Sequence, residues 1–380
     1  MRELGVYIHI PFCKRKCYYC DFISFGNKGE LVQKYINALA DEIVESAKQI
    51  NREYEITTIY IGGGTPSFID EENIEKILNN VYENYNVSKK AEITIEINPG
   101  TVTWEKITKY KQIGINRVSI GLQSTNDELL KQIGRIHNYE DFANTYNMVK
   151  KAGFDNINID LMLGLPNQTI RDLQESLNKV IELNPKHISV YSLIVEEETP
   201  LQKMLEENKI SLPPEEMERD MYWLVKETLE KNDYEHYEIS NFAKKGYESK
   251  HNLNCWEQKE YLGFGVAAHS YMNSKRFSNT SIIEEYIKNI EEGKIKKNQT
   301  IEENQTNEDK QKEYMLLGLR KIEGVRIQQF KKKYVHNPLF LYHKELEKLV
   351  NEELIEIDGD YIKLTKKGLD LANLVWEKFI

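Results

Sequence analysis

The sequence predicts an α/β fold in which helices surround a parallel β-sheet. Short runs of β-branched or alternating apolar residues recur before residue 200, and amphipathic stretches such as 31–49 and 74–85 lie between them. The six predicted strands are 5–10, 56–61, 92–97, 117–122, 156–162 and 187–193. A repeated strand–helix order indicates parallel strands joined by helical crossovers. Six such units fit a partial or closed barrel better than an open sheet.

The alternation of predicted strands and helices ends at about residue 200. Two prolines at 213–214 precede two glutamates and predict a helix over 215–231, because proline suits the first turn and acidic side chains complement the N-terminal dipole. A strand is expected over 235–240. We therefore predict a barrel core at 1–205 and an α+β extension of the barrel at 206–300.

The last part of the chain predicts a small separate module at 301–380. Residues 291–313 are almost wholly polar, which indicates a solvated linker. Helical periodicity over 316–320 and 339–349 is followed by a predicted hairpin at 354–364, whose Asp-Gly pair is typical of a tight turn. This order resembles a winged helix. Acidic and basic residues are nearly balanced here, which favours a packing or docking role over DNA binding.

Composition excludes several classes of protein. The chain has 380 residues, with 51 Lys and Arg against 61 Asp and Glu, giving a net charge of −10. This balance argues against a nucleic-acid partner, because phosphate binding needs a basic surface. No apolar run approaches the ~18 residues of a membrane span, and the first twelve residues lack a secretory pattern. We expect a cytoplasmic protein in a reducing environment.

The cysteines are clustered in a way that predicts a metal site. Three of the four, Cys13, Cys17 and Cys20, fall within eight residues, directly after the first predicted strand. Three thiolates from one loop can hold three irons of a cubane cluster and leave one iron open for a chelating ligand. A tetrahedral zinc site is the alternative, and it would need His9 or Asp21 as its fourth ligand.

Glycines and polar residues follow the other strands. The run Gly62-Gly63-Gly64-Thr65-Pro66 follows the second strand, where glycines let the backbone approach a ligand closely. Three polar side chains, Glu96, Gln123 and Asp160, lie at or near the ends of later strands, where barrel enzymes have their active sites. A fourth polar residue, Arg135, lies in the helical region that follows Gln123. The alternative is that they are turn, capping or surface residues.

The cysteine spacing, with Tyr19 before the last cysteine, resembles the radical S-adenosylmethionine (radical SAM) superfamily. That resemblance implies a partial (β/α)6 barrel and a 4Fe–4S cluster held by Cys13, Cys17 and Cys20. In the superfamily, the open iron chelates the amino and carboxylate groups of S-adenosylmethionine, and an electron from the reduced cluster cleaves the sulfonium. An electron donor such as flavodoxin or ferredoxin is therefore an implied partner.

Several motifs together resemble the oxygen-independent coproporphyrinogen III oxidase group, the HemN/HemW family. They are Tyr7-x-His9-Ile10-Pro11-Phe12-Cys13, the glycine run, Glu96-x-Asn98-Pro99, Gly121-x-Gln123, Arg135 and Asn158-x-Asp160-Leu161. The resemblance implies that the cluster-bound S-adenosylmethionine contacts Tyr7, Gly63 and Glu96. It also implies that residues around a second S-adenosylmethionine of the dehydrogenase match Tyr19, Gly64, Thr65, Gln123, Arg135 and Asp160.

Two departures favour the HemW branch, the heme chaperones. The dehydrogenase has a fourth cysteine where this chain has Phe22, and it has a long segment before the cluster motif where this chain has six residues before Tyr7. HemW proteins carry a His-Asn-x-x-Tyr-Trp motif implicated in heme binding. Here the motif begins at His251 and ends at Trp256, with Cys255 in place of the tyrosine.

The resemblance makes His251 the candidate heme ligand. Histidine is a common axial ligand of heme iron, and Trp256 could stack on a porphyrin. His269 is a rival ligand in a Gly/Ala-rich segment. The alternative is that His251 and Trp256 only pack the open side of the barrel.

The expected function is that of a HemW-like heme chaperone. Such a protein binds a 4Fe–4S cluster, S-adenosylmethionine and heme, and it transfers heme to an acceptor protein. One alternative is an enzyme, a coproporphyrinogen III dehydrogenase that forms protoporphyrinogen IX by radical decarboxylation. Another is a radical SAM enzyme with an unrelated substrate, so whether the chain is an enzyme stays open.

Overall fold

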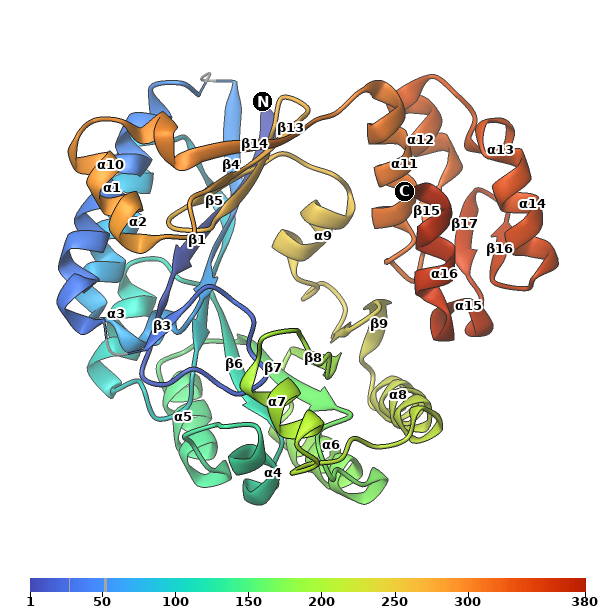
Figure 1. Cartoon of the computed structure of the whole chain (residues 1–380), viewed down its shortest axis with the longest axis horizontal. Coiled ribbons are helices and arrows are strands. Elements are labelled where there is room, and N and C mark those ends of the chain that lie inside the picture. The colour runs from blue at the N-terminus through green and yellow to red at the C-terminus, as the bar shows by residue number, and fades with distance from the viewer. Residues whose placement is uncertain (27, 51–52) are drawn as a thin grey trace.

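The computed structural model describes residues 1–26, 28–50 and 53–380, and its core is a parallel sheet (Figure 1). All six predicted parallel strands are confirmed, and they lie side by side in chain order. They are β1 (Arg2–Ile10), β4 (Tyr54–Gly63), β5 (Val87–Ile97), β6 (Arg117–Gln123), β7 (Asn156–Leu163) and β8 (His187–Ser192). Along each strand, every second side chain points outward from the barrel. These outward side chains are buried, as Ile93, Ile95, Ile157 and Ile159 show.

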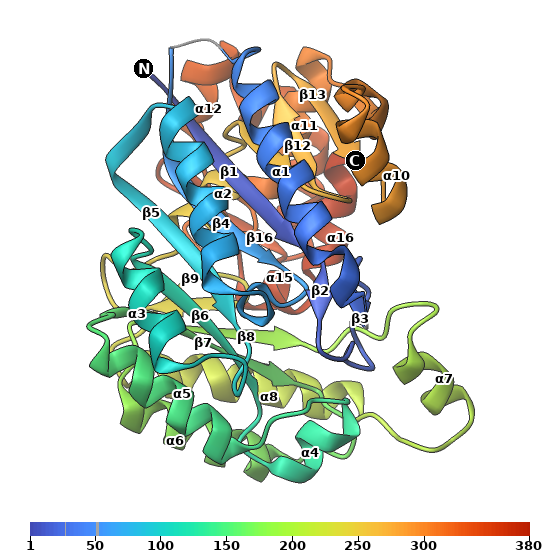
Figure 2. The same cartoon turned by 90° about the vertical axis from the view of Figure 1, so that its left-hand side faces the viewer.

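Helices cover the outer face of this sheet (Figure 2). Each buries an apolar stripe; α6, for example, buries Leu173, Leu177 and Val180, and it begins with a capping box between Thr169 and Asp172. The helices of the core are α1 (Val32–Ala47), α2 (Glu71–Asn84), α3 (Trp104–Gln112), α4 (Asp127–Gln132), α5 (Tyr139–Lys151), α6 (Ile170–Leu183), α7 (Pro200–Glu206) and α8 (Glu215–Glu230). Among the described residues, no helix combines the length and the apolar character needed to cross a membrane.

The sheet continues beyond the six parallel strands on both sides and stays open. Beside β1 lies the parallel strand β11 (Tyr261–Phe264), followed by three antiparallel strands: β12 (His269–Met272), β13 (Lys275–Asn279) and β14 (Gln299–Asn304). Beyond β8 lie β10 (Asn241–Ala243) and β9 (Glu235–Glu238). Within the described ranges the two outer strands do not pair, so the barrel is partial and the closed alternative is wrong.

The predicted linker at 291–313 is wrong. That segment forms the end of α10 (Ile283–Glu291), a 3-10 turn over Ile295–Asn298, strand β14 and the start of α11 (Asn307–Gly318). Strand β14 pairs along β13 and is a sheet edge with little burial on either face. An edge strand of this kind needs no alternation of apolar and polar residues, so its polar sequence has the composition of a linker.

The C-terminal part has its own hydrophobic cluster, which includes Met315, Phe330, Leu349 and Val375. The predicted hairpin is confirmed as β16 and β17, with Gly359 at a positive φ of 59° in the turn. The elements after α11 are β15 (Val325–Arg326), α12 (Ile327–Tyr334), α13 (Pro338–Leu341), α14 (His343–Asn351), β16 (Ile355–Asp358), β17 (Tyr361–Leu364), α15 (Lys366–Asp370) and α16 (Ala372–Trp376). The exact domain boundaries stay predictions.

Helix α9 (Lys250–Trp256) lies between the sheet and this C-terminal part (Figure 1). The guanidinium of Arg320 lies 4.7 Å from the ring centre of Trp256 and 4.5 Å from that of Trp376. Helix α8 is also tied to the C-terminal part, because Trp223 on α8 donates a hydrogen bond of 2.9 Å to Asp370 on α15. Cation–π contacts of a half-buried arginine are stabilising, so α9 and the C-terminal part are held together.

A buried carboxylate joins the extension to the barrel. Glu42 on α1 accepts hydrogen bonds from Gly265 N (2.8 Å), Asn279 Nδ2 (2.7 Å) and Tyr286 Oη (2.6 Å). Burial raises the pKa of Glu42, although these donors oppose the shift. Its neighbour Tyr35 donates to the carbonyl of His9 at 2.7 Å. The network therefore connects α1, the turn before β12, strand β13, helix α10 and the end of β1.

Replacing Glu42 by alanine should destabilise the protein by about 3 kcal/mol or more, because three buried donors lose their acceptor and each costs roughly 1–3 kcal/mol. Urea unfolding followed by circular dichroism measures this. Glu45→Ala is the matched control, since Glu45 is exposed one turn from Glu42 on the same helix and should change stability by less than about 0.5 kcal/mol. Equal effects of the two substitutions would contradict the proposed importance of the network.

Candidate metal and cofactor site

The cysteine loop leaves the carboxyl end of β1 and returns beside it. The short strands β2 (Phe12–Cys13) and β3 (Phe25–Gly26) pair in parallel, and Phe25 N donates to Pro11 O at 2.6 Å. Cys13 is buried, whereas Cys17 and Cys20 are half-buried. We call residues 11–26 the cluster loop. It places all three predicted thiol ligands at the end of the central strand, where the barrel opens.

The chemistry of the three thiols fits an iron–sulfur cluster. Burial raises the pKa of Cys13, and it raises the pKa of Cys20 to about 11, so both are protonated thiols until a metal displaces the proton. In the part of the chain that the structure describes, no three Cys, His, Asp or Glu side chains converge on one point to hold a single ion. A cubane cluster does not require that convergence, because each thiolate binds a different iron.

His9 is not available as the fourth ligand of a zinc site. Its Nδ1 lies 2.9 Å from Tyr7 Oη and its Nε2 lies 2.8 Å from the carbonyl oxygen of Ile23. Burial lowers the pKa of His9, so the ring is neutral and one nitrogen donates while the other accepts. His9 thus ties β1 to the returning arm of the cluster loop. The sequence offers His9 as a motif residue and a possible zinc ligand, and its structural role arises only from the tertiary fold.

The glycine run packs directly against the cluster loop. Gly64 N donates to Ile10 O (2.9 Å) and Thr65 N donates to Phe12 O (2.8 Å). A Cβ on Gly64 would lie 3.0 Å from Cys13 Sγ, and one on Gly63, whose φ is +112°, would lie 2.4 Å from the His9 ring. Glycine is therefore required here by the close approach of the two loops.

Glu96 lies behind the glycine run. It accepts hydrogen bonds from Tyr60 Oη (2.8 Å) and Gly63 N (3.1 Å). Burial raises the pKa of Glu96 to about 7, and the charge of Asp160 adds to the shift, while the Tyr60 hydroxyl opposes it. Burial also raises the pKa of Tyr7. Tyr7, Gly63 and Glu96 thus lie together, each half-buried, toward the carboxyl ends of β1, β4 and β5.

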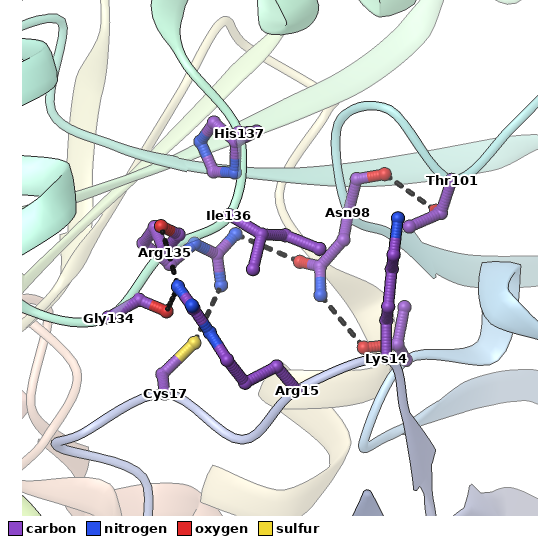
Figure 3. A pocket seen from close by; sticks show the side chains of 10 residues that line it. Lys14, Arg15, Cys17, Asn98, Thr101, Gly134, Arg135, Ile136 and His137 are labelled. Carbon is purple, nitrogen blue, oxygen red and sulfur yellow. Dashed lines mark hydrogen bonds between the residues drawn. The ribbon is translucent and has the colours of Figure 1, made fainter. Parts of the chain in front are cut away.

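Arg135 reaches the cluster loop from the opposite side (Figure 3). Its Nη2 donates to Asn98 Oδ1 (2.9 Å) and Gly121 O (2.5 Å), and its Nη1 lies 3.6 Å from Cys17 Sγ. The expectation that Arg135 is helical is wrong, since α4 ends at Gln132 and Arg135 lies in the loop before α5.

Two residues of this region were missed by the sequence analysis as site residues. Arg15 donates to the carbonyl oxygens of Gly134 (3.0 Å) and Arg135 (3.2 Å), and with Lys14 and Cys17 it lines a small cavity (Figure 3). Asn98 donates to Thr65 Oγ1 at 2.8 Å while accepting from Arg135. The Asn-Pro pair after Glu96 was a signal for Asn98, whereas nothing in the sequence distinguishes Arg15 from a surface charge.

The remaining predicted cofactor residues lie deeper in the barrel or beside the loop. Asp160 accepts from Ser119 Oγ (2.9 Å) and Asn158 Nδ2 (2.7 Å), so its carboxylate is held within the sheet interior. Gln123 is the last residue of β6 and has a positive φ of 71°. Tyr19 packs against a small apolar cluster, and Arg135, Cys17, Cys20 and Asp160 are its ionisable neighbours. These residues surround the site from β6, β7 and the loop.

The candidate heme motif lies away from the cluster loop, on α9. His251 is only 8% exposed, its Nδ1 lies 2.9 Å from Thr58 Oγ1, and its ring centre lies 5.2 Å from that of Tyr60. Burial lowers the pKa of His251 to about 4. Burial also raises the pKa of Cys255 to about 11. The motif is thus packed against β4 and the C-terminal part, and Cys255 is separate from the three loop cysteines.

Comparisons with known proteins agree with this architecture. The model of the radical SAM superfamily matches residues 7–180, and that of the HemN C-terminal domain matches residues 305–371. The solved coproporphyrinogen III oxidase HemN of Escherichia coli has the same fold, with a TM-score of 0.86 at 23% identity, covering 100% of this chain and 90% of that one.

Sequence relatives extend over the whole chain. The protein named heme chaperone HemW of Bacillus subtilis is 38% identical, covering 99% of both chains. The protein of that name in Lactococcus lactis is 37% identical over 99% of this chain and 97% of its own length, and that of Escherichia coli is 38% identical over 70% of this chain and 69% of its own. The chain therefore belongs to the HemW family of the radical SAM superfamily.

Proposed function

We propose that this protein is a heme chaperone that binds heme and transfers it to an acceptor protein. The observation that carries the proposal is the match over 99% of both chains to a protein named heme chaperone HemW. Phe22 also supports it, because it stands where the dehydrogenase has a fourth cysteine, and it is 60% exposed beside Cys20. A cytoplasmic location is part of the proposal, because clustered thiols serve as metal ligands in a reducing compartment.

The cluster loop is proposed to hold a 4Fe–4S cluster through Cys13, Cys17 and Cys20, with S-adenosylmethionine on the open iron. When bound, this pair supplies one-electron chemistry, and a protein electron donor must reduce it. The chain's own residues would prepare the site. Glycines 62–64 let the cluster loop pack closely against the end of β4, and His9 holds the loop in place through its hydrogen bond to Ile23.

Glu96 is proposed to contact the S-adenosylmethionine on the open iron, together with Tyr7 and Gly63. Its carboxylate accepts from Gly63 N, and the sulfonium cation would favour its ionised form. Arg135 is already bonded to Asn98, Gly121 and Cys17. We therefore assign Arg135 mainly to neutralising the thiolates. A second S-adenosylmethionine would have to displace these hydrogen bonds to bind Arg135. Its other proposed contacts are Tyr19, Gly64, Thr65, Gln123 and Asp160.

Heme transfer is the experiment that tests the function. The cluster would be reconstituted without oxygen, hemin added, and the loaded protein mixed with an apo-hemoprotein while the Soret band and the acceptor's activity are followed. Transfer without formation of protoporphyrinogen IX from coproporphyrinogen III is expected. Product formation from that porphyrinogen would instead identify the protein as the dehydrogenase.

Replacing Cys13 by serine should abolish the broad visible absorbance of the cluster and most of the bound iron, because one iron loses its thiolate. Iron and sulfide analysis after anaerobic reconstitution measures this. Cys255→Ser is the matched control: Cys255 is a half-buried thiol, as Cys17 and Cys20 are, but it lies on α9 outside the cluster loop. A Cys13→Ser protein with full iron content would refute the assignment.

Replacing Glu96 by glutamine should change how stability depends on pH in the cofactor-free protein. The folded pKa of about 7 exceeds the ordinary value of 4.5, so the folded chain keeps a proton that the unfolded chain releases. Wild-type stability should therefore fall as pH rises from 4.5 to 7, by roughly 2–3 kcal/mol. Glutamine does not titrate, so Glu96→Gln should lose this pH-dependent contribution to stability.

Unfolding midpoints in urea at pH 5 and pH 8 measure the Glu96 effect. The exposed Glu83→Gln on α2 is the control and should follow the wild type. Identical pH dependence in wild type and Glu96→Gln would mean that Glu96 is ordinarily ionised in the folded protein.

A further inference from the structure

The cluster loop is a basic segment of an acidic protein. It carries Lys14, Arg15 and Lys16 between its first two cysteines, against the single carboxylate of Asp21, whereas the whole chain has a net charge of −10. Lys14 and Arg15 are exposed. Arg15 is bonded to two carbonyl oxygens, which leave its positive charge unneutralised. The loop therefore presents a local positive field on a molecule that otherwise repels acidic partners.

The small cavity beside this basic segment extends the positive surface to a cluster ligand (Figure 3). None of the ten residues that line it is acidic, and Lys14, Arg15 and Arg135 are among them. Cys17 also lines it, whereas Cys13 and Cys20 are not among the lining residues. The thiol of Cys17 is thus the cluster ligand that lies next to the basic surface.

An apolar side chain lies within this basic surface. Ile136 lines the same cavity and is 44% exposed, directly after Arg135 in the chain. Specific protein contacts commonly place an apolar centre inside a polar or charged rim. Electron-transfer encounters need only a small contact area, below about 1,200 Å² in total, so a patch of this extent is sufficient.

These features fit an acidic flavin-bearing protein better than a small anion. A small anion would be held by the charges alone and would leave Ile136 without a role. The dimethylbenzene edge of a flavin is apolar, so it matches Ile136, while carboxylates around the flavin match Lys14 and Arg15. Electrons pass more readily between redox groups that approach closely, and Cys17 brings the cluster ligands next to this surface.

We propose that Lys14, Arg15 and Ile136 form the docking surface for an acidic flavodoxin-type carrier that reduces the cluster. The inference rests on the proposed cluster site of Cys13, Cys17 and Cys20. The anionic flavin hydroquinone of the carrier loses one electron and becomes the neutral semiquinone, and the cluster gains that electron without any bond being made or broken. Charge attraction speeds the encounter and leaves the complex weak, which suits a carrier that must leave again.

Anaerobic stopped-flow mixing of the cluster-loaded protein with flavodoxin hydroquinone tests the proposal, because the semiquinone absorbance reports the transfer. Lys14→Glu should lower the second-order rate by about 10-fold at low ionic strength. Salt at about 1 M should remove most of this difference, since the Debye length then falls to about 3 Å. Lys89→Glu is the matched control: Lys89 is also exposed, but it lies near the amino end of β5, at the opposite end of the sheet. Its rate should equal that of the wild type.

Ile136→Ser tests the apolar contact separately. It should weaken the binding of oxidised flavodoxin, measured by titration calorimetry, by roughly 3- to 10-fold at every ionic strength, because an apolar contact is not screened by salt. Ile170→Ser is the matched control, since Ile170 is 40% exposed but lies on α6. It should bind flavodoxin as the wild type does.

Iron and sulfide analysis of each protein separates failure of the docking surface from failure of the cluster site. Full cluster content in Lys14→Glu, with the rate and salt dependence of the wild type, would overturn the docking surface and leave the proposed function intact. Slower reduction by an acidic ferredoxin, with flavodoxin unaffected, would overturn the choice of carrier. A wild-type protein that binds no cluster would overturn the proposed cofactor site and, with it, this inference.

Discussion

The placement of the extension depends on one carboxylate with no access to solvent. Glu42 satisfies donors from a turn, a strand and a helix that are more than 200 residues away in sequence. These elements also pack on the apolar surface of α1, and the carboxylate adds three directional hydrogen bonds that fix their positions relative to this helix. Through Tyr35, the same network reaches the carbonyl of His9, next to the cluster loop. The extension and the strand that leads into the cluster loop therefore share one buried anchor.

The cluster loop illustrates how close packing and chemistry impose the same residue types. Gly63 and Gly64 leave room for the His9 ring and for Cys13, while the backbone N–H of Gly63 also serves Glu96. A larger residue would displace a thiol and remove a hydrogen bond together. Arg135 acts similarly on the other side, because it bonds to Cys17 and to the end of β6. Small structural changes here would affect metal binding and folding at once.

The sequence predicted the elements that local patterns encode and missed those that depend on distant contacts. The six parallel strands and the hairpin at 354–364 are periodic or carry an Asp-Gly turn, so each was found. Strand β14 was taken for a linker because an edge strand has no buried face. Arg135 was assigned to a helix because Gly134, with φ of 78°, ends α4 by a turn that the pattern does not mark. The Arg320 contacts and the roles of His9 and Arg15 arise only from the tertiary fold.

The position of β1 in the sheet has a consequence for biosynthesis. It is synthesised before both of its partners, because one of its edges pairs with β4 and the other with β11, which ends at residue 264. Pairings of such long sequence separation form late and slowly. Until they form, the strand that leads into the three cysteines has an unpaired edge and is prone to aggregation. A cluster loop on a fully paired β1 can therefore form only after residue 264 has been synthesised.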